Sequence, residues 1–378
     1  MPILVTCPRL GVVKSKTLAY LFVQSRFAEG GVAGRRLVPS FPQYSSDGTL
    51  GADEERCYLR CVDLRPFAIE PRTTSETLEV YFHVGAHKTG TTTFQKLIRE
   101  NAVQLYRQGI VPVAREIPQL LGGPLSVDNE MQIVRPLRQA VKERRAGKRS
   151  TAHAQLKKLF QSIVQDAPSA VFSDEAYLGR RLGPHFPVLY PEAGDYIEAL
   201  AELFPERRVR IILYIRHQDR LIESNFLHAV KTGYAGNFDT YLHSLNREKL
   251  HWEGVADNIA RVVGAQNLVV LPFEQIREGF EPFARRFFEI FSRSAELQIN
   301  PVSANPSLSG VGIRLAQYLS PKMSADWWRV VRQPLQRAFS NRVFPEARLL
   351  SSIQRDRLKE TYQSDYERTI HKYPGWDK

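Results

Sequence analysis

Cysteine is scarce in this chain, which has only Cys7, Cys57 and Cys61 among its 378 residues. An odd count without a regular framework argues against a disulfide scaffold and is typical of reduced thiols, so we expect a cytoplasmic protein. Cys57 and Cys61 stand in a stretch without histidine, which argues against a zinc site there.

Long hydrophobic runs are also missing, and none approaches the roughly 20 residues of a transmembrane helix. The apolar stretch 18–23 is too short for a secretory signal and has no convincing cleavage site. Acidic residues are outnumbered, with 40 Asp and Glu against 52 Lys and Arg and a net charge of +12. This surplus favours anionic ligands. No helix-turn-helix, zinc finger or aromatic RNA-binding pattern is present, so we do not expect nucleic acid as a partner.

Clear periodicity is absent from residues 1–76, which are rich in Gly, Pro, Ser and Arg. Before Asp47 the only acidic residue is Glu29. Three interpretations fit this composition: a transit-like leader, a disordered extension, or translated sequence upstream of the natural start. We expect residues 77–378 to form one α/β domain, because the alternation of strands and helices begins there.

The stretch from Tyr81 to Glu100 predicts a strand, a loop and a helix. Apolar residues first alternate, at Leu78, Val80, Phe82 and Val84, and the run stops at Gly85. After the loop, helical spacing connects Phe94, Leu97, Ile98, Ala102 and Leu105. A loop between a strand and a helix start offers backbone N–H groups and the positive end of the helix dipole, so it suits a phosphate or sulfate.

Further strands are expected at 109–113, 170–173, 209–215 and 268–271, and helices at 152–164, 194–204 and 280–291. The nearly continuous apolar run 209–215 predicts a central strand that is buried on both faces. Residues 114–150 read as an excursion from the alternation of strands and helices. Their basic run, 142–149, is better explained as a solvated helix end than as a patch for an acidic substrate. The alternation implies a parallel sheet with ligands at the carboxyl ends of its strands.

The loop differs from the ATP-binding Walker A pattern, because Thr91 follows Gly90 where that pattern has lysine. The lysine lies inside the loop, at Lys88. The sequence His-Lys-Thr-Gly-Thr-Thr resembles the 5′-phosphosulfate loop of bacterial sulfotransferases, whose donor is 3′-phosphoadenosine 5′-phosphosulfate (PAPS). The resemblance implies a three-layer α/β/α fold like that of the P-loop NTPases. It also implies that the donor is contacted by His87, Lys88, Thr89, Gly90, Thr91 and Thr92.

A second resemblance lies after the apolar run 209–215. In sulfotransferases an arginine at a strand end and a serine eight positions later hold the 3′-phosphate of the donor, and Arg216 and Ser224 have that separation. The guanidinium group offers a planar fork to a phosphate, and the hydroxyl a directional bond. The chain departs from the family in having His217-Gln218 where Asp-Pro is commoner.

A third resemblance is Ser173-Asp174-Glu175, at the place where related sulfotransferases have an acidic residue that faces the acceptor. Glu175 is our first choice as general base, with Asp174 or His87 as alternatives. A helix N-terminal acid that interacts with the helix dipole is almost as good an interpretation. We read His83, inside the strand, as a residue of the core or of the layer directly behind the site. Residues 305–310 resemble a C-terminal sulfotransferase element and also fit a helix N-cap at Ser309 or Ser307.

The resemblance implies transfer of a sulfuryl group from PAPS to a hydroxyl acceptor, such as a carbohydrate, a glycolipid or a small alcohol. Lys88 would neutralise charge on the bridging oxygen, and no metal is expected. Residues 170–175 also look like a Walker B strand, so a nucleotide-dependent kinase or ATPase is the alternative. A nucleotide-binding protein without activity is a further one. The sequence names neither the acceptor nor the oligomeric state.

Overall fold

The computed structural model describes residues 78–114, 129–292, 297–300 and 306–375. These residues lie in one compact unit, which spans residues 61–378. The predictions for residues 1–76 fall outside the described residues, and so does Asn305.

A parallel sheet of five strands forms the centre of this unit, and it confirms the predicted α/β class. Its strands are β1 (Glu79–His83), β2 (Ile110–Ala114), β3 (Ser169–Ser173), β4 (Arg208–Ile215) and β5 (Leu268–Pro272). The order is β2-β3-β1-β4-β5. The apolar run 209–215 is therefore an interior strand, as its burial requires, but the strand at the centre is β1.

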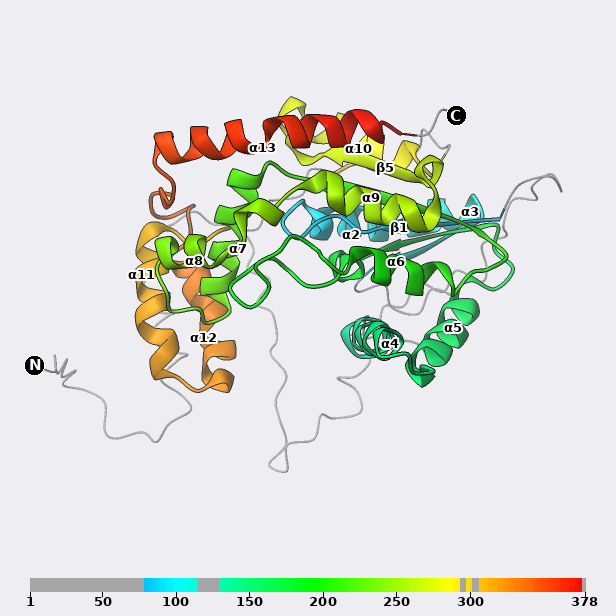
Figure 1. Cartoon of the computed structure of the whole chain (residues 1–378), viewed down its shortest axis with the longest axis horizontal. Helices are drawn as coiled ribbons and strands as arrows, with labels where there is room; N and C mark the ends of the chain where they lie inside the picture. The colour runs from blue at the N-terminus through cyan, green and yellow to red at the C-terminus, as the bar shows by residue number, and fades with distance from the viewer. Residues whose placement is uncertain (1–77, 115–128, 293–296, 301–305, 376–378) are drawn as a thin grey trace, which may run out of the picture. The chain divides into compact units, whose positions relative to one another are not determined.

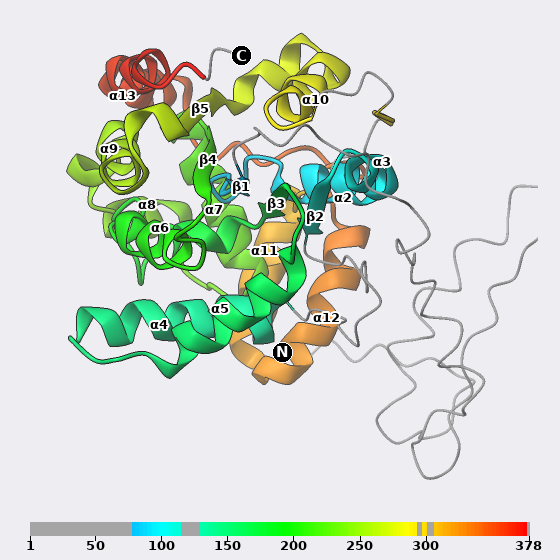
Figure 2. The same cartoon turned by 90° about the vertical axis from the view of Figure 1, so that its right-hand side faces the viewer.

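Helices cover both faces of the sheet, which gives three layers (Figure 2). One face carries α2 (Thr91–Glu100), α3 (Ala102–Arg107) and α10 (Phe280–Glu289). The other face carries α5 (Thr151–Val164), α6 (Ala193–Ala201) and α9 (Trp252–Val263). Figure 1 shows a further group at one end of the sheet, formed by α7 (Gln218–Lys231), α8 (Phe238–Ser244), α11 (Gly310–Leu319) and α12 (Ala325–Ala338).

The remaining elements connect or flank these layers. They are the π-helix η2 (Asn129–Val134), α4 (Arg135–Arg145), α13 (Ser352–Lys372) and the short 3₁₀ turns η3 (Glu175–Leu178), η4 (Arg247–Lys249), η5 (Ala265–Asn267), η6 (Phe273–Glu278) and η7 (Ser320–Lys322). The basic run falls at the end of α4, as the reading of a solvated helix end predicts, but the excursion that we expected over 114–150 did not include the rest of this helix. Leu137, Ala140 and Val141 are buried at helical spacing, but the charged residues around them hide the pattern.

Aromatic rings fill the core on both faces of β1. Phe82 stacks on Phe172 at 5.2 Å between ring centroids, and Phe160 joins them from α5. On the opposite face, the ring centroid of Phe94 in α2 lies 4.2 Å from the ring centroid of Phe287 in α10. Complete burial of a phenylalanine contributes about 1.5–3 kcal/mol, so these rings hold the strand and the start of α2 firmly in place.

The helix predicted after the loop is broken at Asn101, which is fully buried. Its side-chain amide donates to the carbonyls of Leu97 and Gln298, at 2.9 and 2.8 Å, and its carbonyl oxygen accepts from Gln298 N–H at 2.7 Å. The predicted N-cap is confirmed at Ser309, whose hydroxyl accepts from Gly312 N–H. No helix of the described residues is long and apolar enough to cross a membrane.

Candidate functional site

Three loops meet at the carboxyl edge of the sheet because their strands end side by side. His83, the last residue of β1, is paired with Ser173 of β3 and with Ile212 of β4. The loop between β1 and α2, residues 84–90, therefore lies beside the acidic pair that follows β3 and near the Arg216 segment that follows β4. The sheet brings together the three motifs that the sequence singled out.

The loop is held by its own backbone and by β4. Ala86 N–H donates to the carbonyl of Tyr214, and both the N–H and the hydroxyl of Thr89 donate to the carbonyl of Ala86. The backbone N–H groups of residues 88, 90, 91 and 92 have no acceptor among the described residues. The hydroxyl of Thr91 is buried and is also without a described partner. Such a set of donors at the start of α2 is suited to an anion.

Glycine is required at both ends of the loop. A Cβ on Gly85 would lie 2.8 Å from Nε2 of His83 and 3.1 Å from the hydroxyl oxygens of Thr89 and Thr91. Gly90 has φ +78°, and its Cβ would lie 3.0 Å from the ring of Phe273. These close approaches let the backbone wrap tightly, as the pattern of two glycines predicts.

A circuit of contacts ties the loop to two neighbouring segments. His87 N–H donates to the hydroxyl of Tyr190 at 2.8 Å, and the imidazole Nδ1 lies 2.9 Å from the same oxygen. The ring of Tyr190 stacks on Trp252, whose indole N–H donates to the carbonyl of Arg216. Arg216 Nη1 in turn donates to the carbonyl of Lys88 at 3.0 Å. The circuit begins and ends on the loop, so it restrains the loop from both sides.

Lys88 lies in a strongly positive environment. Its side chain is exposed to solvent. Loss of solvation to the surrounding protein, together with the charges of Arg181, Arg216 and Lys231, lowers the pKa of Lys88 to about 8, against an opposing effect of Glu175. Positive charge is therefore concentrated where the loop presents its N–H groups.

His87 is almost fully buried, and burial together with nearby cations holds its pKa well below the usual range. The neutral ring can accept a hydrogen bond from the hydroxyl of Tyr190 at Nδ1. The side chain that was a candidate for anion contact or for general base is thus engaged with Tyr190 in this structure.

Arg216 combines burial with an aromatic contact. Burial lowers its pKa from the ordinary value, and the carboxylate of Glu274 opposes this effect. Its guanidinium carbon lies 5.3 Å from the centroid of the Phe273 ring. Ser224 lies two turns into α7, partly exposed, and no hydrogen bond connects it to Arg216 in the described part of the chain. Their shared role in binding a 3′-phosphate stays a prediction.

The acidic pair after β3 is divided between two environments. The carboxylate of Asp174 accepts from Ala176 N–H at 2.7 Å and so caps η3. The interpretation as a helix N-terminal acid fits both residues, because Asp174 is the N-cap of η3 and Glu175 lies in its first turn. Glu175 is partly buried, and its Oε2 is shielded from solvent without a hydrogen-bond partner among the described residues. Glu175 is thus the carboxylate with a free oxygen near Lys88.

The interpretation of His83 as a core residue is confirmed, since it is fully buried. Its Nδ1 is hydrogen-bonded to the hydroxyl of Ser173 at 2.8 Å, and burial lowers its pKa to about 3. The neutral ring packs edge-on against Phe94 and Tyr214. The ring is tightly packed directly below the loop.

The departure at His217-Gln218 has a structural explanation. The imidazole of His217 stacks on the ring of Tyr366 in α13, with 3.8 Å between the ring centroids. The side-chain amide of Gln218 donates to the carboxylate of Asp365 in the same helix. Asp365 also accepts from the N–H of Trp252, at the start of α9. These residues dock the C-terminal helix against the segment that carries Arg216.

Sequence reasoning missed Tyr190, Arg181 and Phe273. Phe273 directly follows β5, so the rule that ligands gather at strand ends could have found it. Tyr190 and Arg181 come from the irregular stretch 179–192, which has no periodic signal that would single them out.

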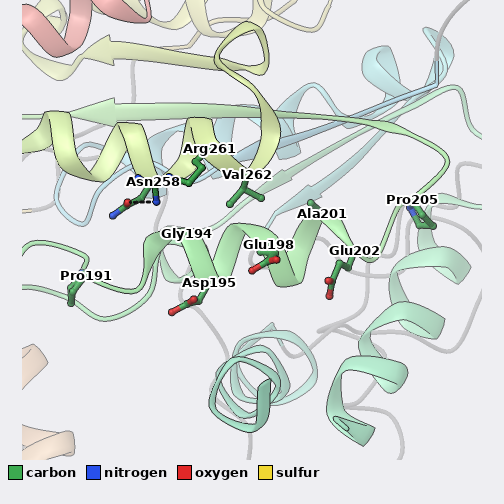
Figure 3. A pocket seen from close by; sticks show the side chains of 10 residues that line it. All are labelled: Pro191, Gly194, Asp195, Glu198, Ala201, Glu202, Pro205, Asn258, Arg261 and Val262. Carbon is green, nitrogen blue, oxygen red and sulfur yellow. Dashed lines mark hydrogen bonds between the residues drawn. The ribbon is translucent and has the colours of Figure 1, made fainter. Parts of the chain in front are cut away.

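A cavity of about 700 Å³ lies between α6 and α9 (Figure 3). Its lining includes the carboxylates of Asp195, Glu198 and Glu202, but no residue of the loop. Within the described residues, no group of three or more His, Cys, Asp or Glu side chains could hold a metal ion.

No family model and no curated protein matches the chain. Among solved structures, it is similar to a sulfotransferase from Alicyclobacillus acidocaldarius (12% identity, TM-score 0.36, covering 66% of this chain and 98% of that one). It is also similar to a sulfotransferase domain from the curacin biosynthetic pathway (12% identity, TM-score 0.32, covering 77% of this chain and 99% of that one). A third similar structure is retinol dehydratase in complex with androsterone and the inactive cofactor PAP (11% identity, TM-score 0.29, covering 78% of this chain and 81% of that one). Because these values are low, we base the proposal below on the site itself.

Proposed function

We propose that the domain at residues 77–378 is a sulfotransferase that transfers a sulfuryl group from PAPS to a hydroxyl acceptor. The observation that carries this proposal is the loop between β1 and α2. Its N–H groups at residues 88 and 90–92 have no partner in the described part of the chain, its lysine lies inside the loop, and Arg216 donates to its backbone. A Walker A loop would instead have lysine directly after the second glycine.

The residues of the loop fit the donor. The N–H groups and the buried hydroxyl of Thr91 would hold the oxygens of the 5′-phosphosulfate, with further contacts from His87, Thr89 and Thr92. Lys88 would neutralise the charge that develops on the bridging oxygen. Arg216 and Ser224 would hold the 3′-phosphate, because a guanidinium group binds phosphate oxygens in pairs.

PAPS, as the donor substrate, supplies the sulfuryl group, and Glu175 would activate the acceptor. The acceptor oxygen forms a bond to sulfur while the bond between sulfur and the bridging phosphate oxygen breaks. The hydroxyl proton passes to the carboxylate of Glu175, and 3′-phosphoadenosine 5′-phosphate leaves. The acceptor class proposed from the sequence is a carbohydrate or glycolipid, or a small alcohol.

The kinase or ATPase alternative would use Asp174 at a magnesium ion. In this structure the carboxylate of Asp174 already caps η3 through Ala176 N–H, which makes it less suited to that role. A nucleotide-binding protein without activity would bind the same nucleotide but transfer nothing to any acceptor offered.

The test is calorimetric binding of 3′-phosphoadenosine 5′-phosphate, compared with ATP and magnesium, to the wild-type protein and to Arg216→Ala. We expect the wild type to prefer the 3′-phosphorylated nucleotide. The variant should bind it at least tenfold more weakly, because a charged hydrogen bond contributes about 1.5–3 kcal/mol. Arg329→Ala, on the exposed face of α12, is the matched control. A preference of the wild type for ATP with magnesium would contradict the proposal.

A further inference from the structure

The histidine directly behind the loop has a ring nitrogen that its surroundings do not use. The imidazole of His83 is fully buried, and its Nε2 has no hydrogen-bond partner among the described residues. The rings of Phe94, Tyr214 and Phe287 pack against it edge-on. An unpaired polar atom among such rings costs free energy that an apolar side chain of similar size would not cost. Packing alone therefore gives no reason for a histidine at this position.

The other ring nitrogen fixes the tautomer of His83. Its Nδ1 lies 2.8 Å from the hydroxyl oxygen of Ser173, the residue paired with it on β3. This hydroxyl is buried and has no other hydrogen bond in the described part of the chain. Its proton therefore has one acceptor, the lone pair of Nδ1. Because burial lowers the pKa of His83 to about 3, the ring is neutral, and its single proton is on Nε2.

Two threonine hydroxyls lie on the same side of Gly85 as this Nε2–H. A Cβ on Gly85 would be 2.8 Å from Nε2 and 3.1 Å from the hydroxyl oxygens of Thr89 and Thr91. The hydroxyl of Thr89 already donates to the carbonyl of Ala86. The hydroxyl of Thr91, at the start of α2, is buried and has no described partner. The Nε2–H and this hydroxyl thus face the same small space, which stays open because residue 85 has no side chain.

These two unsatisfied groups complement each other. A hydroxyl oxygen can accept one hydrogen bond while its own proton is donated elsewhere. When Nε2–H donates to the oxygen of Thr91, the hydroxyl proton cannot point at the ring, so it is left for an anion in the loop. The two groups are not hydrogen-bonded in this structure. Hydrogen bonds of this kind often tighten only when the ligand is bound.

We propose that His83 is a positioning residue of the loop: supported by Ser173, its Nε2–H donates to the hydroxyl of Thr91, which in turn donates to the 5′-phosphosulfate. This inference rests on the proposed function and deepens it. Each member of the chain from Ser173 to the anion donates in the same direction, so the bound anion satisfies the last hydroxyl. His83 itself does not touch the donor.

A double-mutant cycle, measured as calorimetric binding of 3′-phosphoadenosine 5′-phosphate, tests this role. Thr91→Val removes the hydroxyl and keeps the shape. His83→Asn has an amide in place of Nδ1 but no donor in place of Nε2. Each should weaken binding about tenfold, because one hydrogen bond to a charged group is lost or misdirected. The double variant should also be about tenfold weaker, since His83 acts through Thr91.

Two further variants separate positioning from packing. His83→Gln carries its amide N–H to the place of Nε2, so it should bind the nucleotide within about threefold of the wild type. Thr369→Val removes a buried hydroxyl from α13 and is the matched control for Thr91→Val. It should leave nucleotide binding unchanged. Binding by His83→Gln that is as weak as that of His83→Asn would overturn the proposal.

A double variant about a hundredfold weaker than the wild type would show that His83 and Thr91 act independently, and the proposal would fail while the proposed function stands. Nitrogen-15 NMR of the wild-type imidazoles, with Ser173→Ala to assign His83, keeps the test independent of how the His83 variants fold. We expect a neutral ring protonated at Nε2, and a proton on Nδ1 would refute the chain of donors. If the wild type prefers ATP with magnesium but the cycle shows the same coupling, His83 keeps its role and the proposed function fails.

Discussion

Gly85→Ala is the sharpest structural test of the phosphate loop. The new Cβ would lie 2.8 Å from Nε2 of His83 and 3.1 Å from each of two hydroxyl oxygens, those of Thr89 and Thr91. His83 cannot retreat, because it is fully buried among the rings of Phe94, Tyr214 and Phe287. The loop itself must therefore shift away from the strand.

The expected cost follows from this crowding. Inserting a methyl group into a well-packed interior destabilises a protein by about 1–3 kcal/mol. At about 2–4 °C per kcal/mol, the midpoint of thermal unfolding should fall by about 2–12 °C. Because the displaced loop no longer aims its N–H groups at the anion, affinity for 3′-phosphoadenosine 5′-phosphate should also fall at least tenfold, which is about 1.4 kcal/mol.

Thermal unfolding and nucleotide calorimetry, performed on the same preparations, measure both effects. Gly183→Ala is the matched control, since nothing lies within 4 Å of its Cβ and its φ is not positive. We expect the control to behave like the wild type. If Gly85→Ala shows the same unfolding midpoint and nucleotide affinity as Gly183→Ala, the close approach of the loop to His83 does not exist in the protein.

Two further predictions concern residues of the loop and its support. Lys88 has a pKa lowered to about 8, and a bound anion favours its protonated form. Affinity for 3′-phosphoadenosine 5′-phosphate should therefore be highest below pH 8 and fall by up to tenfold per pH unit above it. Calorimetry from pH 6.5 to 9.5 measures this, and the same slope in Lys88→Ala would contradict it. Tyr190→Phe leaves the buried N–H of His87 without its acceptor and should lower the free energy of unfolding by about 1–3 kcal/mol in urea denaturation. Tyr318→Phe, on the surface of α11, should change little, and equal losses in the two variants would refute the role of Tyr190.

The elements nearest the loop could be predicted because their signals are local. Strand β1 and helix α2 show apolar periods of two and about 3.6, and the two glycines mark the turn between them. Only the basic end of helix α4 was predicted, because charges on its exposed face outnumber its three buried apolar residues. Asn101 breaks the predicted helix through hydrogen bonds to Gln298, a residue almost 200 positions away.

The sequence by itself determined the α/β class, the loop and the order of its candidate residues, because short-range periodicity and spacing are visible along the chain. Only the tertiary structure decided what surrounds the loop. Tyr190, Phe273 and Arg181 reach it from segments that lack a periodic signal or lie far away in sequence. The division of roles between Asp174 and Glu175 also needed the structure, because a cap and an unpartnered carboxylate differ only in their neighbours. Contacts between distant segments arise from packing, which no local pattern encodes.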